Sequence, residues 1–400
     1  MSQTPRFIQL STLSSYPAVL LNRDDSGLAK RIPFGGASRI RVSSQCLKRH
    51  WRTVEDRYSL SKVADDLNLS VRSRALFRKR LQEPLIAEGF SHGVTEAVLL
   101  AFGKDLYEGK DKEERRIEEG KSPLDRKEVV VLGEPEIQFL YQEARTLCQQ
   151  ANGDVQQAEK LAKQYLKKNK QNFQALVCGA GIDGAMFGRF MSGDPGSRVS
   201  AAVHVAHAFT VHAESSETDY FSAVDDLLTS VEGGSGHLGA TELTSGLFYS
   251  YVVIDVPLLV SNLTGCRPEN WLDEDRSTAG RVIRHFIHLM ATVSPGAKLG
   301  STAPFDYAGL VLAEAGERQP RTLANAFLDP ISLKASDLFG RTVQAMDAYV
   351  TSMDTMYGSG EERWLACRYA NAGINGSVRV SLPQLAQSVE QAVVDHKEGR

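Results

Sequence analysis

Long apolar runs are missing from this sequence of 400 residues. No run approaches the ~18 consecutive apolar residues that span a bilayer, so we expect no contact with a membrane. The N-terminus also lacks the basic and then apolar pattern of a secretion signal, which predicts a cytoplasmic protein. The five cysteines are odd in number and include no C-x-x-C pair, and both features argue against a disulfide framework or a zinc ribbon.

Catalytic signatures are missing as well. The sequence contains no G-x-S-x-G, no H-E-x-x-H and no G-K-[ST] loop. Gly179 to Gly184 matches G-x-G-x-x-G, but helix-breaking residues follow where a dinucleotide site needs a helix. His204 and His207 would share a helix face with His212 nearby, yet no carboxylate stands at a metal-ligand offset, so we expect core or loop histidines. The sequence therefore predicts a protein that is not an enzyme and has neither a metal site nor a cofactor.

One enzymatic alternative stays open. Asp225 and Asp226 are a carboxylate pair of the kind that holds magnesium in nucleases. Adjacent acids point apart in a regular strand or helix, and no general base stands near them in the sequence. A metal-dependent ribonuclease that uses this pair is thus the alternative to a binding protein.

Acidic residues are absent from one segment, although the formal net charge of the chain is only −3. No Asp or Glu occurs between residues 26 and 54, a stretch rich in lysine and arginine. On a helix that begins near Ser44, Leu47 and Trp51 face the core. The polar and basic side chains share another face, which with the N-terminal N–H groups predicts a phosphate-binding ridge or, alternatively, a solvated helix face. They are Gln45, Lys48, Arg49 and Arg52.

The chain is long enough for two or three units of roughly 150 residues, or for one domain with a large insertion. Helical patterns dominate residues 60–175, which predicts an inserted helical subdomain. Strand and helix patterns alternate on both sides of it, so the expected fold class is α+β. We expect strands over residues 7–13, 39–42, 246–256 and 376–382, and helices over residues 46–58, 280–292 and 337–355.

A second basic cluster ends the helical segment. Lys160, Lys163 and Lys167 fall on one stripe of a helix, and Lys168 and Lys170 follow closely. A solvated face is the usual meaning of such a stripe, and contact with nucleic acid is the alternative.

Eight sequence blocks carry a resemblance to a known family. They are LNRDD (21–25), FGG (34–36), R-x-R-x-S-S-Q-x-L-K-R (39–49), VSAAVHVAHAFTVH (199–212), FSAVDDL (221–227), GHLGATELTSGLFYSY (236–251), SPGAK (294–298) and ANAF (324–327). In this order they resemble the CasC (Cas-seven family) backbone subunit of Cascade, the type I-E CRISPR surveillance complex. Residues 60–175 match weakly, as an inserted lobe would.

The resemblance implies a hand-shaped protein. Its palm, a ferredoxin-like sheet related to the RNA-recognition motif, would comprise residues 1–60 and 176–400. Its fingers would be a helical insertion over residues 61–175, and its thumb a protruding hairpin near residues 217–247. The palm would hold the CRISPR RNA through basic and hydroxyl side chains. Those expected are Arg23, Lys30, Arg39, Arg41, Ser43, Gln45, Lys48, Arg49 and Arg52.

The resemblance also implies a place in a larger assembly. Copies of the chain would stack head-to-tail into a filament along the CRISPR RNA, and each thumb would kink the guide so that its bases pair with target DNA. The other expected partners are Cascade subunits: a CasD-type cap, a small subunit, a large subunit and an RNA-processing endonuclease. Phe190 and Leu238 stand where the family places the wedge beside a flipped nucleotide. Target DNA would meet the lysine stripe: Lys160, Lys163, Lys167, Lys168 and Lys170.

Overall fold

A computed structural model describes residues 4–65, 67–107, 122–174, 181–189, 199–223, 237–334 and 336–395 of the chain. The chain divides into two compact units. The first comprises Met1–Ser59, Val203–Val256 and Ala279–Arg400, and the second comprises Leu60–Ala202 and Pro257–Thr278. The helical insertion expected over residues 61–175 lies within the second unit, which also includes two later segments. No helix of the described residues is long and apolar enough to cross a bilayer.

The first unit is built on a mostly antiparallel sheet. Its long strand β9 (His237–Asp255) pairs with β1 (Phe7–Val19), and β1 pairs in turn with β10 (Leu310–Gly316). Beyond β10 the sheet continues with β11 (Glu362–Cys367) and β12 (Ser377–Arg379). Beyond β9 it continues with β7 (Ala208–Thr210), β3 (Ala37–Val42) and β2 (Arg31–Phe34). The short strand β6 (Val203–Val205) also pairs with β9. Strands and helices thus mix in one unit, and the α+β prediction is confirmed.

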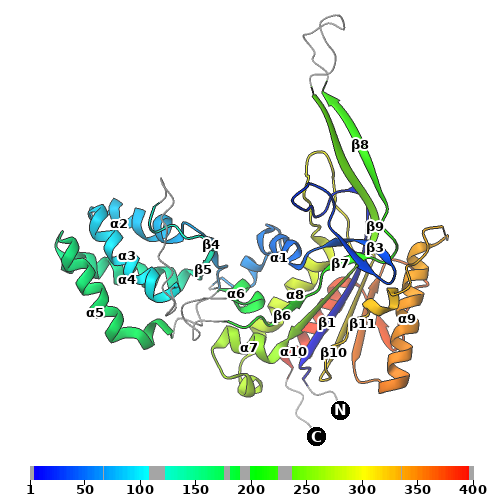
Figure 1. Ribbon diagram of the computed structural model, residues 1–400. Helices are drawn as coiled ribbons and strands as arrows, with labels where there is room; N and C mark the ends of the chain where they lie inside the picture. The colour runs from blue at the N-terminus through cyan, green and yellow to red at the C-terminus, as the bar shows by residue number, and fades with distance from the viewer. Residues whose placement is uncertain are drawn as a thin grey trace, which may run out of the picture. The chain divides into compact units, whose positions relative to one another are not determined.

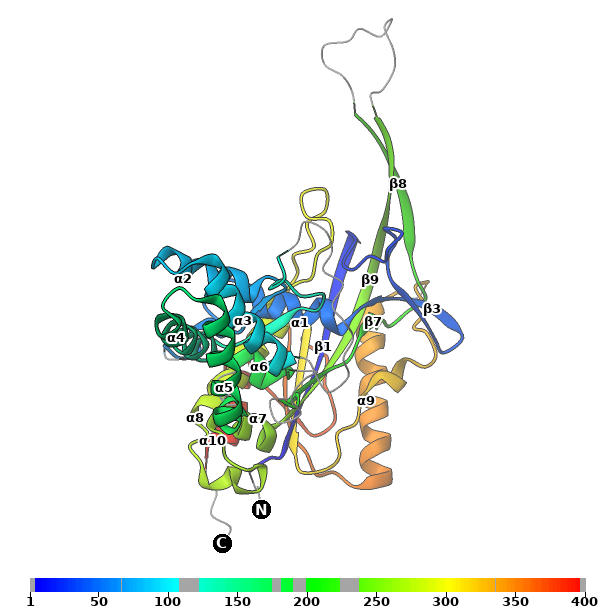
Figure 2. The ribbon, with the colours of Figure 1, turned by 60° about the vertical axis from the view of Figure 1, so that its left-hand side comes forward.

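Helices cover both faces of this sheet (Figure 1, Figure 2). α9 (Leu338–Tyr357) lies on one face, where Phe339 joins Leu13 of β1 in a buried cluster. α8 (Ser277–Thr292) and α10 (Leu382–Val394) lie on the other face. Because successive strand residues point to opposite faces, each central strand supplies apolar side chains to both layers.

A β-hairpin projects from one end of the sheet (Figure 2). β8 (Ser216–Ala223) pairs with the N-terminal half of β9, from Ser216 opposite Thr244 to Ala223 opposite His237. The turn between these strands lies outside the described residues. The sequence predicted a strand only from residue 246, because the preceding residues lack the apolar content of a core strand. In a two-stranded hairpin neither face is covered by a second layer, so polar residues occupy both.

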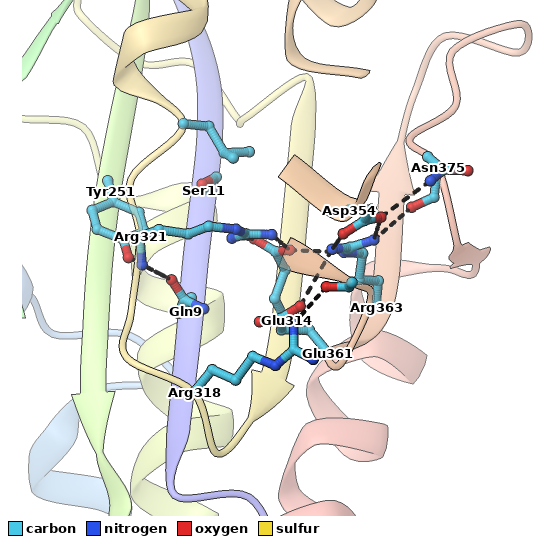
Figure 3. A network of polar contacts seen from close by, with 12 residues as sticks. Gln9, Ser11, Tyr251, Glu314, Arg318, Arg321, Asp354, Glu361, Arg363 and Asn375 are labelled. Atoms are coloured by element: carbon cyan, nitrogen blue, oxygen red, sulfur yellow. Dashed lines mark hydrogen bonds and ion pairs between the residues drawn. The ribbon is translucent and has the colours of Figure 1, made fainter. Parts of the chain in front are cut away.

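A buried ion network fixes the far end of the sheet on its α9 face (Figure 3). Glu314 of β10 is 1% exposed and accepts hydrogen bonds from Arg321 at 2.8 Å and from Nε of Arg363 at 2.8 Å. Both Nη atoms of Arg363 donate to Asp354 of α9, at 2.6 and 2.7 Å. Burial lowers the pKa of Arg363, but hydrogen bonds to Asp354 and Glu314 outweigh this and raise it. The network therefore joins β10, β11 and α9 through paired charges.

The second unit is mainly helical, as its sequence patterns predict. Its apolar core includes Phe102, Leu140 and Ala158, all fully buried. Asp183 is buried and accepts hydrogen bonds from both the N–H and the hydroxyl of Ser70. The unit's elements are η1 (Leu60–Lys62), β4 (Val71–Ser73), η2 (Arg78–Gln82), α2 (Glu83–Ala87), α3 (His92–Tyr107), β5 (Val130–Leu132), α4 (Glu134–Ala151), α5 (Val155–Gln174), α6 (Ile182–Phe187), α7 (Val256–Thr264, from Pro257) and η5 (Pro268–Asp273).

Two local predictions are wrong. The helix expected over residues 46–58 ends at Thr53, where Val54 adopts an extended conformation. The helix expected to carry His204 and His207 is absent, because this segment forms β6, a turn and β7. The β-branched residues of VHVAHAFTV favour strands, and pairing with β9 decides the local structure.

Candidate nucleic-acid interface

The LNRDD block forms a loop whose shape its own polar side chains set. Oδ1 of Asn22 accepts a hydrogen bond from the backbone N–H of Ser43 at 3.0 Å. This contact ties the loop to the beginning of α1 (Ser44–Thr53). Oδ1 of Asp24 accepts from the N–H of Leu28 at 3.0 Å and closes the turn within the loop. The Asp24 carboxylate is therefore engaged in turn formation.

The same loop carries two of the predicted cations. Arg23 is exposed and Lys30 is half-buried. Burial raises the pKa of the Cys46 thiol, while the positive charges of Lys30 and Arg49 act in the opposite direction. Both cations therefore lie close to the same thiol. The end of the loop and α1 thus both bring positive charge near Cys46.

Helix α1 displays the predicted basic face. The Oγ of Ser43 accepts from the N–H of Cys46 at 3.3 Å, so Ser43 is the N-cap and its hydroxyl is engaged there. Leu47 and Trp51 are buried, and the Trp51 ring meets Phe286 of α8 edge-to-face at 5.1 Å. This packing turns the polar face outward: Gln45 and Arg49 are exposed, and Lys48 and Arg52 are half-buried.

The structure corrects the prediction for Arg39. Its side chain is 0% exposed, and its guanidinium donates to three backbone carbonyls. Nη1 donates to Thr210 at 3.0 Å, Nη2 to Phe327 at 2.9 Å and Nε to Phe34 at 3.2 Å. Arg39 therefore leaves the set of RNA contacts, because no donor of its guanidinium is accessible. It fastens β3 to the turn η6 (Ala324–Phe327).

That contact explains why the FGG and ANAF blocks occur together. Gly35 has a φ of +61°, a conformation that favours glycine. A Cβ at Gly35 would lie 1.5 Å from the backbone oxygen of Leu328, directly after the ANAF turn. The β2–β3 turn and the ANAF turn thus approach each other too closely for any side chain at this position.

Arg31 is neutralised inside the first unit. Its Nε lies 2.6 Å from the Glu214 carboxylate, and its Nη2 bonds to Glu242 of β9. Glu242 also accepts from the N–H of Ala29 at 2.6 Å. These contacts clamp the start of β2 to the base of the projecting hairpin, and they occupy the Arg31 charge.

Other cations of the acid-free segment have no such partner. Among the described residues, no carboxylate forms an ion pair with Lys30, Arg41 or Arg49. Arg41 of β3 donates from Nε to the carbonyl of Arg31 at 3.1 Å, and its Nη1 lies 2.9 Å from Nδ1 of His207. Cations gathered without counter-charges produce a positive potential that attracts anions.

The projecting hairpin carries two aromatic residues that the sequence reasoning missed. Tyr220 is 79% exposed, and Phe221 beside it is 44% exposed. The Phe221 ring packs over Gly239 on the paired strand, and Nζ of Lys298 lies 5.2 Å from its centroid. Exposed aromatic rings on a protruding hairpin are suited to stacking on bases. The available signal was the adjacent pair of Tyr220 and Phe221, where Phe221 begins the FSAVDDL block.

The two predicted wedge residues stay predictions. Phe190 lies outside the described residues, and only the backbone of Leu238 in β9 is described. Arg189, directly before Phe190, is buried in an ion pair with Glu136 at 2.5 Å. The residue preceding the expected wedge is thus anchored within the second unit.

The lysine stripe lies on helix α5 of the second unit. Ala158, Ala162 and Leu166 face the core. Nζ of Lys163 lies 2.5 Å from the Glu159 carboxylate one turn earlier, an exposed pair that leaves the lysine accessible. Lys160, Lys167 and Lys168 are also exposed, while the side chain of Lys170 lies outside the described residues.

The structure describes some of the residues that the sequence offered as metal ligands. No group of three or more potential metal ligands occurs among them. His212 is buried with Nδ1 donating to the carbonyl of Ala213 at 2.7 Å and Nε2 accepting from Leu247 at 3.1 Å, so it is a core histidine. Asp225 and Asp226 lie outside the described part of the chain.

The G-x-G-x-x-G match has a structural explanation in its described half. A Cβ at Gly181 would lie 2.7 Å from the carbonyl oxygen of Asn68. The N–H of Ile182, the first residue of the six-residue helix α6, donates to that same oxygen at 3.1 Å. The glycine therefore admits the backbone of a neighbouring loop, where a dinucleotide site would admit a phosphate.

The fold is shared with solved structures, among them the following two. A chain of a structure described as "CRISPR RNA-guided surveillance complex, pre-nicking" matches with a TM-score of 0.77 at 24% identity, over 97% of this chain and 100% of that one. A chain of another "CRISPR RNA-guided surveillance complex" matches with a TM-score of 0.69 at 20% identity, over 96% and 99%. No curated protein matches the chain.

The family follows from the sequence itself. A family described as "CT1975-like protein" matches residues 8–393, and the chain belongs to it. The resemblance to the Cas-seven family is therefore confirmed.

Proposed function

We propose that this chain is a multi-copy backbone subunit of a type I-E CRISPR RNA-guided surveillance complex, Cascade. In this role it binds the spacer part of the CRISPR RNA through phosphates and leaves the base edges open for pairing with target DNA. The observation that carries the proposal is that three cations of the acid-free segment, Lys30, Arg41 and Arg49, have no carboxylate partner among the described residues. RNA phosphates would supply the missing negative charge.

Each part of the chain has a role in this proposal. The first unit is the palm, with the ferredoxin-like sheet that the family resemblance implies. The helical second unit provides the fingers. The β8–β9 hairpin is the thumb, which lies over the guide and kinks it at regular intervals. Tyr220 stacks on nucleic acid there, while Phe190 and Leu238 flank the displaced nucleotide.

The proposed partners follow from the assembly. Copies of the chain stack head-to-tail on one CRISPR RNA, and the filament meets a CasD-type cap, a small subunit, a large subunit and an RNA-processing endonuclease. The protein works in the cytoplasm and is not itself an enzyme. Its contribution to antiviral defence is to hold the guide in a shape that speeds pairing with target DNA.

Co-purified nucleic acid tests the proposal. When the chain is produced with its partner subunits and a CRISPR RNA, we expect RNA of one uniform length to purify with it and to resist added ribonuclease. Assembly that is unaffected by ribonuclease and contains no RNA would contradict the proposal. Magnesium-dependent cleavage of the RNA that is abolished in Asp226→Asn would instead favour the ribonuclease alternative.

We further propose that the exposed lysines of α5 bind target DNA. Non-specific phosphate contacts retain a duplex during strand separation, and identical helices on stacked copies would add many weak contacts. Replacing Lys163, Lys167 and Lys168 by Ala should leave RNA-dependent assembly intact and weaken binding of double-stranded DNA. The logarithmic salt dependence should flatten by about 0.9 for each phosphate that the variant no longer neutralises. DNA binding is measured by electrophoretic mobility shift at several salt concentrations.

A matched variant controls for the change in net charge. Lys79, Lys104 and Lys127 are exposed lysines of the same unit, and Lys79 pairs with Glu83 one turn away as Lys163 does with Glu159. Replacing these three by Ala removes the same charge from the same unit and should leave DNA affinity unchanged. Equal DNA affinity of the two triple variants would overturn the assignment to α5.

A further inference from the structure

His207 occupies an unusual position beside the basic surface. It lies in the turn between β6 and β7, and its side chain is exposed. Its Nδ1 lies 2.9 Å from Nη1 of Arg41. A guanidinium can only donate, so Nδ1 is the acceptor and the ring proton of the neutral imidazole resides on Nε2. Among the described residues, that Nε2–H has no hydrogen-bond partner.

The charged groups that face His207 are both positive. They are Arg41 of β3 and Lys30 of the loop before β2. Partial loss of solvent around the ring, followed by these two charges, lowers the pKa of His207 from its ordinary value of 6.5. No carboxylate of the described residues pairs with either cation, although Arg31 next to Lys30 bonds to two glutamates. The backbone N–H of Arg41 donates to the carbonyl of Lys30 at 2.8 Å, so the three basic residues are neighbours and a bound anion would relieve their mutual repulsion.

We propose that Lys30, Arg41 and His207 together bind one RNA phosphate, with His207 as a direct ligand through Nε2–H, and that binding is coupled to proton uptake by the imidazole. The inference rests on the proposed function, because that function supplies the phosphate. The proton comes from solvent and is added at Nδ1. A protonated Nδ1 no longer accepts from Arg41, so the guanidinium becomes free to donate to the same phosphate.

This coupling gives RNA binding a defined pH dependence. In the free protein the neutral imidazole persists to below pH 6.5, since its pKa is lowered. A bound phosphate favours the charged ring and raises that pKa. Affinity should therefore rise as the pH falls from about 7.5 to about 6, by no more than tenfold per pH unit for a single proton. If His207 only held Arg41 in place through its hydrogen bond, RNA affinity would not rise as the pH falls.

Two substitutions separate phosphate contact from bracing. Asn at this position keeps an acceptor near the place of Nδ1 but cannot take up a proton, and it does not reach the place of Nε2. Gln offers an amide near the place of Nε2 and is equally unable to titrate. His204 is an exposed histidine of β6 in the same segment, and His204→Asn is the matched control.

The experiment measures binding of a labelled single-stranded RNA oligonucleotide to the full chain by fluorescence anisotropy. Measurements at pH 6 and pH 7.5 use one ionic strength, and circular dichroism verifies that each variant is folded. We expect wild type and His204→Asn to bind about fivefold more tightly at pH 6 than at pH 7.5. His207→Asn and His207→Gln should lose this gain, and Gln should keep more of the affinity at pH 7.5 than Asn.

The outcomes distinguish this inference from the function on which it rests. If wild type binds no RNA at either pH, the proposed function fails and the phosphate site with it. If wild type binds RNA in a manner sensitive to Lys48→Glu with Arg49→Glu, but His207→Asn retains the affinity and the pH dependence, only the His207 assignment is overturned. An equal loss of affinity at both pH values in His207→Asn, with the pH gain intact, would also overturn it.

Discussion

The double variant Lys48→Glu with Arg49→Glu should fail to form full-length assemblies on guide RNA. Both side chains belong to the polar face of α1, which the burial of Leu47 and Trp51 turns outward. A hydrogen bond to a charged group contributes about 1.5–3 kcal/mol, so removing two such hydrogen bonds should weaken RNA binding at least 100-fold. The salt dependence should also fall by about 0.7 for each phosphate of the single strand that is no longer neutralised. Size-exclusion chromatography and a salt titration of RNA affinity measure the two effects.

A control with the same change in charge separates local contact from net charge. Lys334 and Arg341 are exposed in the same unit, before and within α9. Their replacement by Glu also shifts the net charge by −4, since each cation becomes an anion, but it leaves α1 unchanged. We expect this control to assemble normally. Normal assembly of the Lys48 and Arg49 variant would show that α1 does not hold the guide.

Glu314→Ala should destabilise the first unit more than any exposed ion-pair variant. The substitution leaves the buried Arg363 and the partly buried Arg321 without the carboxylate that both contact. Breaking a buried pair in this way costs about 3–5 kcal/mol, because the remaining charges are not solvated. Urea denaturation followed by circular dichroism should show the transition of the first unit at a much lower midpoint.

An exposed pair provides the comparison. Arg284 of α8 lies 3.2 Å from Glu390 of α10, and its side chain is partly exposed. Arg284→Ala should change the free energy of unfolding by about 0–1 kcal/mol. Acid gives a second measurement: the hydrogen bond from Arg363 holds the pKa of Asp354 below 3.8. The stabilisation by Asp354 is thus present above that value and is lost as the pH falls through the lower folded-state pKa. Similar midpoints for Glu314→Ala and Arg284→Ala would refute the role of the network.

The sequence predicted those helices and strands whose buried positions are all apolar. The C-terminal half of β9 and helices α8 and α9 have clear periodicity and were found close to their observed positions. Strands β10 and β11 were missed although they lie inside the sheet. Each contains a charged residue, Glu314 in β10 and Arg363 in β11, that is buried because it is paired within the ion network. From the sequence alone, a charged residue in a strand is assigned to the protein surface, because its burial requires a partner of opposite charge that the sequence does not identify.

The basic surface shows the same limit. The face of α1 and its Ser43 cap could be predicted because they depend on residues within one helix. Arg39 and Arg41 are two residues apart in β3 and look equivalent in the sequence. Carbonyls of Thr210 and Phe327 enclose Arg39, and those residues are far away in the chain. Long-range packing therefore decides which arginine is structural and which is available to an anion.

Strand β9 belongs both to the projecting hairpin and to the middle of the sheet. It runs without interruption from His237 to Asp255, a length of roughly 60 Å at the usual rise of ~3.3 Å per residue. The N-terminal half of β9 pairs with β8 and its C-terminal half pairs with β1, and no loop separates these halves. A force that displaces the outer end of the hairpin is therefore transmitted along β9 to β1. The hairpin is a continuous extension of the sheet, so it bends together with the sheet and does not rotate about a flexible hinge in β9. The twist of the sheet at the base of the hairpin sets the direction in which the hairpin projects.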